Sequence, residues 1–205
     1  LKEPRVILFF VLSFAFYFSY QLVDFYLGSF LDKSGGMSAV YAGWCVAVVL
    51  EIPFMPLTNK IVDRWGIRSL IFISTVFGAV RYGWISLQIL GLPVPSVLYS
   101  QLLHGIHYTG FYIGSVYWLR AVFPDHLYGT GNGAYNVLAA ALGGILGNLA
   151  FGWMLFAGHG SSYAGLTTAH YLPLFGGAAA IQLIIFMGFL LLREPVRKKA
   201  PAPAT

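Results

Sequence analysis

Five ionisable side chains lie inside long apolar stretches of this sequence, and they are the residues best suited to chemistry. They are Asp24, Glu51, Arg81, His104 and His107. A charged side chain at the centre of a lipid bilayer costs about 2.5–3.5 kcal/mol on insertion scales, so its presence there indicates a function. Carboxylates and imidazoles exchange protons, and the imidazoles do so near physiological pH. We expect all five to face one water-filled cavity in which opposite charges meet.

The spacing of further polar and aromatic residues predicts helical stripes that line this cavity. Residues three or four positions apart share a helix face. One stripe consists of Tyr17, Gln21, Asp24 and Gly28, and another of Gln101, His104, His107, Tyr108 and Phe111. The rings of Tyr17, Tyr108 and Phe111 would form a cavity wall for a flat or sugar-like organic solute. The alternative for the tyrosines and glutamines is that they only form hydrogen bonds across helix interfaces.

Glu51 lies beside a predicted helix kink, because Pro53 and Pro56 follow it. Proline lacks an N–H group and leaves carbonyl groups without their helical donors. A kinked helix that carries a carboxylate suits a gate or a binding element, and we expect Glu51 and one of the two histidines to exchange protons before solute binds. The alternative is a structural clamp between Glu51 and Arg81. The two hypotheses are compatible, since a clamp that breaks on protonation is a switch.

The histidines also permit a metal hypothesis, because His104 and His107 share a helix face. The remaining histidines, His126, His159 and His170, fall in predicted loops or at a helix end. The sequence has no nucleophile elbow, phosphate-binding loop or paired-carboxylate motif. We therefore expect no enzyme, no metal and no cofactor, with the proton as the coupling ion.

The composition requires a membrane. Of 205 residues, 58% are hydrophobic and 9% are charged, whereas a soluble domain has about 25% charged residues. Such a chain cannot form a soluble surface. The net charge of +5 would suggest nucleic-acid binding in a soluble protein, but the basic residues here occupy connecting loops. We expect the lipid bilayer and a small organic solute as partners, and no nucleic acid.

Six apolar runs predict an all-α integral membrane bundle over residues 1–195. The runs cover residues 5–27, 40–57, 69–90, 96–122, 131–156 and 170–192. Each is close to the ~20 residues that a helix needs to cross the hydrocarbon core, whereas barrel strands would have about ten with strict alternation. Turn residues at 34–36, 91–93 and 158–160 separate some of the runs. Residues 196–205 are expected to form a disordered cytoplasmic tail.

The basic residues predict the orientation of these spans. Of the 12 lysine and arginine residues, ten fall in the termini and loops on one side, and the opposite loops carry only Lys33. By the positive-inside rule, both termini and the loop at 59–68 are expected to be cytoplasmic.

The fifth run contains small residues at helical spacing. Ala139, Gly143 and Gly147 recur every four residues, with Gly144 and Asn148 beside them. Small residues in this pattern let membrane helices approach closely. We interpret the pattern as packing rather than chemistry, and the glycine-rich residues 129–133 as a flexible connection.

The polar loop between the second and third runs contains the pair Asp63 and Arg64, followed by Gly66 and Arg68. It resembles the loop signature of the major facilitator superfamily, although Asn59 stands where that family usually has glycine. The resemblance implies that the glycine permits a tight turn and that the charges latch neighbouring helix ends on the cytoplasmic face. It also implies a twelve-helix fold in which these six spans form the C-terminal bundle, with a missing N-terminal six-helix half as partner.

Residues 101–107, with Glu51, Arg81 and their neighbours, resemble the branch of lactose, phenylpropionate and nucleoside permeases, which are proton symporters. Glu51, Arg81 and His104 match a glutamate, an arginine and a histidine that serve sugar recognition and proton transfer in lactose permease. His107 stands where that permease has its proton-carrying glutamate. Asp24 resembles an acidic position whose lysine partner is replaced here by Gln101.

We expect a secondary active transporter of a bacterial inner (cell) membrane that carries out proton-coupled symport of a small organic solute by alternating access. The alternatives are a uniporter or antiporter of the same fold, and a six-span membrane subunit that transports nothing. Aromatic acids, nucleosides and sugars all remain open as substrates.

Overall fold

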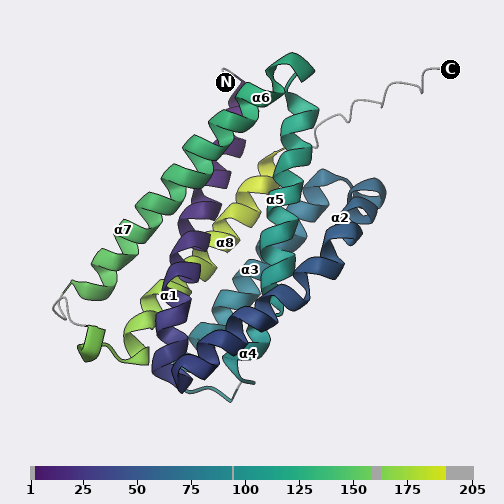
Figure 1. Ribbon diagram of the computed structural model, residues 1–205. Coiled ribbons are helices and arrows are strands. Elements are labelled where there is room, and N and C mark those ends of the chain that lie inside the picture. Colours follow the sequence, from purple (N-terminus) through teal and green to yellow (C-terminus); the bar gives the residue numbers. More distant parts are fainter. Residues whose placement is uncertain (1–2, 94, 158–162, 193–205) are drawn as a thin grey trace.

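The computed structural model describes residues 3–93, 95–157 and 163–192, and all regular structure in these ranges is helical (Figure 1). The α-helices are α1 (Pro4–Val49), α2 (Glu51–Trp65), α3 (Ile67–Ile89), α4 (Val97–Ser100), α5 (Leu103–Val122), α6 (Asp125–Tyr135), α7 (Leu142–Phe156) and α8 (Leu172–Leu191). A π-helical segment, Asn136–Ala141, joins α6 to α7, and 3-10 turns at Tyr163–Gly165 and Thr168–Tyr171 precede α8. The predicted turn at 158–160 and the predicted tail lie outside the described residues.

Helix α1 reverses direction at a pair of glycines. Its 46 residues would extend about 69 Å if straight, roughly twice the thickness of a hydrocarbon core. Gly35 (φ −160°, ψ 15°) and Gly36 (φ 72°, ψ −174°) leave the helical conformation, and the chain doubles back there (Figure 1). Gly36 adopts a positive φ that a side chain would strain. The predicted turn at 34–36 is confirmed.

A second interruption lies next to Glu51. Leu50 (φ −91°, ψ −13°) separates α1 from α2, and Pro56 lies inside α2. Pro53 has no N–H group to donate to the Val49 carbonyl, so the helical hydrogen bonding is broken at this point. The predicted kink beside Glu51 is confirmed.

Four described stretches are long and apolar enough to cross a membrane: Pro4–Trp65, Ile67–Ile89, Asp125–Phe156 and Thr168–Leu191. The third stretch begins six residues before the predicted run at 131–156, and the fourth begins two residues before the predicted run at 170–192. The flexible connection predicted at residues 129–133 is wrong, because these residues lie inside α6. Gly131 is needed there for packing, since a Cβ would lie 2.9 Å from the Phe123 ring.

The helices form two layers. Figure 1 shows α7, α1, α5 and α2 across one face of the bundle, with α3 and α8 behind them. Helix α3 packs on α5 and α8, while α1 packs on α7 and α8. Stacked rings fill the contact between α1 and α5, where Phe16 lies on Phe111 with ring centroids 3.5 Å apart. Close packing at the predicted small residues is confirmed, because a Cβ on Gly147 would lie 2.3 Å from the Phe18 carbonyl oxygen.

One end of the bundle collects the start of α1, the end of α8 and the turn between α2 and α3. Arg68 Nη2 donates to the Leu190 carbonyl oxygen of α8 at 2.8 Å, and Phe9 of α1 contacts Phe189 of α8 edge to face. The basic residues of the α2–α3 region lie at this end, whereas Lys33 lies beside the α1 reversal.

Candidate functional site

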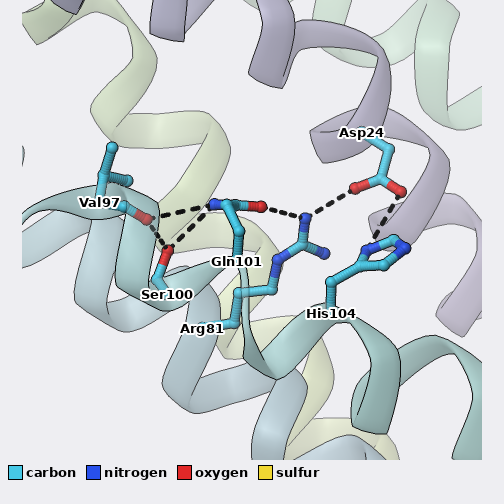
Figure 2. Close-up of polar contacts among 6 residues, drawn as sticks. All are labelled: Asp24, Arg81, Val97, Ser100, Gln101 and His104. Carbon is cyan, nitrogen blue, oxygen red and sulfur yellow. Dashed lines mark hydrogen bonds and ion pairs between the residues drawn. The ribbon is translucent and has the colours of Figure 1, made fainter. Parts of the chain in front are cut away.

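A chain of polar contacts joins α1, α3 and the α4–α5 connection (Figure 2). Arg81 Nη2 donates to Asp24 Oδ1 at 3.1 Å and to Gln101 Oε1 at 2.8 Å. The Arg81 side chain is 0% exposed and the Asp24 side chain 10% exposed. Asp24 therefore supplies a counter-charge to an arginine that has no access to solvent, as a buried ion needs.

The amide of Gln101 is fixed from its other side. Its Nε2 donates to Ser100 Oγ at 3.0 Å and to the Val97 carbonyl oxygen at 3.5 Å. This leaves Oε1 directed at Arg81, as Figure 2 shows. Ser100 was not predicted as a site residue; its only signal in the sequence is its position next to Gln101.

His104 completes this network from α5. Its Nδ1 lies 3.8 Å from Asp24 Oδ2, an ion pair only when the imidazole is protonated. Asp24 thus stands between an arginine and a histidine that approach different carboxylate oxygens (Figure 2). A proton on His104 would strengthen its contact with Asp24, and its loss would remove the charge attraction between these two residues.

Glu51 lies apart from this network, at the start of α2. It is half-buried, and within the described residues its carboxylate forms no hydrogen bond or ion pair. The clamp between Glu51 and Arg81 considered from the sequence is wrong, because Arg81 is held by Asp24 and Gln101. Gly105 of α5 packs on the Glu51 backbone, where a Cβ would lie 2.5 Å from the Glu51 nitrogen. This contact places the backbone of Glu51 against Gly105, which is the residue that follows His104 on α5.

His107 does not join Asp24 and His104. It is fully buried among aromatic rings, with centroids 5.0 Å from Phe16 and 5.3 Å from Tyr82. Ser74 Oγ donates to its backbone carbonyl, and its Nε2 lies against Gly78, 2.4 Å from where a Cβ would be. The three-residue spacing placed His104 and His107 on one helix face, but α3 covers the second of them.

The predicted aromatic wall divides into two groups. Tyr108 is half-buried and stacks with Tyr20 (4.9 Å) and His104 (6.0 Å). Tyr17 and Phe111 instead lie in the core, where Phe111 is 0% exposed and the Tyr17 hydroxyl accepts a hydrogen bond from Tyr135. Tyr20 belongs to the site and was missed, although it lies four residues before Asp24.

Gln21 faces another helix from the rest of the predicted site. Its side chain is exposed on α1 and lies over Gly144 of α7, 3.2 Å from where a Cβ would be. It lines a pocket of ≈ 290 Å³ with Asn148. Asn148 was interpreted from the sequence as part of a packing stripe, so its place in a pocket was missed.

The loop motif ties helix ends together at the basic end of the bundle. Gly66 has φ 87° and ψ 168°, a turn conformation that glycine adopts without strain. Asp63 and Arg64 are exposed, and the Arg64 guanidinium lies 5.7 Å from the Trp65 ring centroid. Arg68 binds the end of α8 as described above, and Asn59 Oδ1 accepts a hydrogen bond of 2.6 Å from Tyr117 of α5. In the described ranges, no group of three His, Cys, Asp or Glu residues gathers as a metal site would.

The sequence of the chain is similar to those of known transporters. The uncharacterized transporter YwbF of Bacillus subtilis (strain 168) is 26% identical over 152 residues, which make up 72% of this chain and 36% of that protein. The putative nucleoside transporter YegT of Escherichia coli (strain K12) is 25% identical over 153 residues, which make up 72% of this chain and 35% of that protein.

The fold resembles that of a solved transporter. A crystal structure of a mutant of the nucleoside transporter NupG superposes with a TM-score of 0.78 at 17% identity, over 94% of this chain and 49% of that one. At this identity the likeness concerns the fold alone. The chain spans about a third of the curated relatives and half of the solved structure.

The relatives are transporters and not enzymes. The family model described as "MFS_1 like family" matches residues 1–164. Because this match covers well over half of the chain, the protein belongs to the MFS_1-like family of transporters, within the major facilitator superfamily.

Proposed function

We propose that the chain is one six-span bundle of a longer, twelve-span transporter. The relatives are two to three times longer than the matched part. The glycine reversal at 35–36 divides α1 into one span before it and a second that continues into α2, while α3, α4–α5, α6–α7 and α8 supply four more. The resemblance of the motifs assigns this bundle to the C-terminal half. The basic residues at one end favour cytoplasmic termini, and the bacterial relatives favour a bacterial cell membrane.

The proposed activity is proton-coupled symport of a small organic solute by alternating access, with two bundles rocking about a site near the bilayer midplane. The observation that carries this proposal is the division of charge among the site residues. Asp24 and Arg81 neutralise each other, which leaves Glu51 as a carboxylate without an ion-pair partner in the described helices. A lone carboxylate at membrane depth is tolerated when it is protonated or reached by water, so Glu51 is the proposed carrier of the coupled proton.

Nucleosides are the proposed first substrate class among the three that the sequence leaves open. One relative is named as a putative nucleoside transporter, and the solved structure is that of a nucleoside transporter. Sugars and aromatic acids are tested in the same assay.

The test is uptake of radiolabelled uridine by the intact protein in bacterial cells that lack their own nucleoside uptake. The unsubstituted protein should accumulate uridine above the external concentration, and a protonophore should abolish this accumulation. Glu51→Gln should remove accumulation while still allowing exchange of uridine across the membrane. The matched control is Glu3→Gln, which removes a carboxylate in an exposed ion pair with Arg5 and should leave uptake unchanged.

Three outcomes would contradict parts of this proposal. Undiminished accumulation by Glu51→Gln would remove Glu51 from proton coupling. Uptake that is equal with and without the protonophore would identify a uniporter. If uridine, lactose and phenylpropionate all fail to enter cells in which the folded protein is present in the membrane, the chain is a non-transporting membrane subunit.

A further inference from the structure

A pocket between α1 and α7 carries two amide side chains that the proton-coupling network does not use. It has a volume of ≈ 290 Å³ and is lined by Gln21, Ala140, Ala141, Gly144, Ile145 and Asn148. We call it the amide pocket. Its lining residues belong to α1, α7 and the π-helical segment, and α1 and α7 are neighbours in the layer formed by α7, α1, α5 and α2 (Figure 1). Because Asp24, Glu51 and His104 lie on α1, α2 and α5 of this layer, we place the second bundle and the transported solute against it.

The helix that forms one wall of the amide pocket is not a regular α-helix at this point. Ala140 and Ala141 belong to the π-helical segment Asn136–Ala141. A π-turn bonds residue i to residue i+5, which widens the helix, and such single turns inside α-helices are frequent at functional sites. Two residues beyond it, Gly143 brings the α7 backbone onto α1, where a Cβ would lie 2.8 Å from the Phe14 carbonyl oxygen. The helices touch at Gly143 and again at Gly147, next to Asn148, so the pocket lies beside a close contact between α1 and α7.

The polar groups of the amide pocket are unusually free for a membrane helix. Asn148 Oδ1 is buried and has no hydrogen-bond partner among the described residues, whereas the backbone carbonyl of Asn148 accepts a hydrogen bond of 3.3 Å from Tyr26. Buried polar atoms are nearly always partnered, so an unpaired one indicates a missing partner. Gln21 adds a second amide that is exposed at the same pocket.

The chemistry of two amides defines the ligand. Each amide offers a carbonyl acceptor beside an NH₂ donor, and this arrangement matches a planar edge that presents a donor next to an acceptor. Asparagine and glutamine read the edges of nucleobases in this way. The alanine and glycine walls leave room for the flat face of a ring. Neither amide carries charge, which suits a neutral ligand.

We propose that the amide pocket binds the hydrogen-bonding edge of the base of the transported nucleoside, with Asn148 and Gln21 as specificity-determining residues. This inference rests on the proposed transport of nucleosides and assigns their base to α1 and α7. The ribose then faces Asp24, His104 and Glu51. Helix α1 then takes part in both functions, because Gln21 faces the amide pocket while Asp24 belongs to the network with Arg81 and His104.

The experiment compares uptake of uridine with uptake of 3-methyluridine, in which a methyl group blocks the N–H donor of the base. The intact unsubstituted protein should take up uridine with a KM about tenfold lower than that for 3-methyluridine. A tenfold ratio corresponds to about 1.4 kcal/mol, the range of one or two net hydrogen bonds. Asn148→Leu keeps a similar size but removes both amide functions, so the KM for uridine should rise about tenfold and equal that for 3-methyluridine.

Two further variants keep the test decisive. Gln21→Leu changes an exposed residue that folding tolerates, and it should also reduce the preference for uridine. The matched control is Gln88→Leu on α3, because Gln88 Oε1 is likewise buried without a partner in the described residues but does not line the amide pocket. This control should keep the preference of the unsubstituted protein for uridine.

The outcomes separate this inference from the function on which it rests. If the unsubstituted protein takes up no uridine, the nucleoside proposal and the pocket assignment both fall. If it takes up uridine and both pocket variants keep the full preference over 3-methyluridine, only the pocket assignment falls. An equal loss of uptake for both nucleosides also overturns it, because the amides would then not contact the edge of the base.

Discussion

Because Asp24 and Arg81 form a buried pair, we expect substitution of either one alone to lower the stability strongly, and substitution of both to restore most of it. Arg81→Gln leaves Asp24 charged, 10% exposed and without the guanidinium that lies 3.1 Å away. Removal of one partner of a buried ion pair costs about 3–5 kcal/mol, because the other charge is left unpaired. For a domain of this size each kcal/mol shifts the melting temperature by about 2–4 °C, so we expect a loss on the order of 10 °C.

The assay is a double-mutant cycle in detergent-solubilised protein, followed by thermal unfolding. Asp24→Asn alone should also destabilise, since it leaves Arg81 unpaired, but the combination with Arg81→Gln should recover most of the loss. The matched control is Arg64→Gln, which removes an exposed arginine at the end of α2 and should change stability by less than about 0.5 kcal/mol. If the effects of the Asp24 and Arg81 substitutions simply add, the two side chains do not form the interaction described here.

Two further predictions concern packing and pH. In thermal melts, Gly105→Ala should destabilise the protein by about 1–3 kcal/mol through overpacking, because its Cβ would lie 2.5 Å from the backbone of Glu51. The control is Gly83→Ala on α3, where nothing lies within 4 Å of the added Cβ. This substitution should be neutral or stabilising. Partial burial and the hydrogen bond to Asp32 raise the pKa of Tyr163 from 10.0 to about 12. The folded state therefore holds this proton more tightly, so that its contribution to stability is intact below pH 10 and is lost between pH 10 and 12. Tyr163→Phe should remove that loss from unfolding curves recorded against pH, and an unchanged alkaline loss would contradict it.

Much of the fold followed from simple patterns in the sequence. The glycine pair at 35–36 predicted a reversal, since only glycine adopts the φ of Gly36 without strain. Pro53 predicted the break at Leu50, because a missing N–H group interrupts a helix wherever it occurs. By contrast, glycine content misled at residues 129–133, where α6 uses a small residue to fit against Phe123 and needs no flexibility.

The candidate site was only partly predictable, because helical spacing defines a face but not the neighbour that covers it. Asp24, Arg81, Gln101 and His104 do meet, as the sequence predicted. The partner of Arg81 was predicted wrongly: the sequence analysis suggested Glu51, whereas Asp24 holds the guanidinium, and which carboxylate it meets depends on how the helices are rotated.

The same limit explains the residues that were placed differently. Gln21 precedes Asp24 by three residues, but that spacing leaves the two side chains about 60° apart around the helix. This angle is enough for Gln21 to face α7 while Asp24 faces α3 and α5. Phe111 likewise shares a predicted helix face with His104, but the ring of Phe16 on α1 covers it. The π-helical segment has no proline or other sequence signal, so the pocket beside Asn148 became visible only with the structure.

The neutral pairing of Asp24 with Arg81 has a consequence for the electrical behaviour of the proposed transport cycle. A charge that crosses the full membrane potential gains or loses about 2.3 kcal/mol per 100 mV, but an ion pair that moves as a unit carries no net charge. Among Asp24, Glu51 and Arg81, this leaves Glu51 as the charge on which the potential acts. If Glu51 carries the proton, a carrier loaded with a neutral nucleoside is indifferent to voltage, and the empty carrier returns with one negative charge. An inside-negative potential then speeds the return of the empty carrier to the outward-facing state. The voltage therefore changes the rate of this return step and not the step in which the solute is carried.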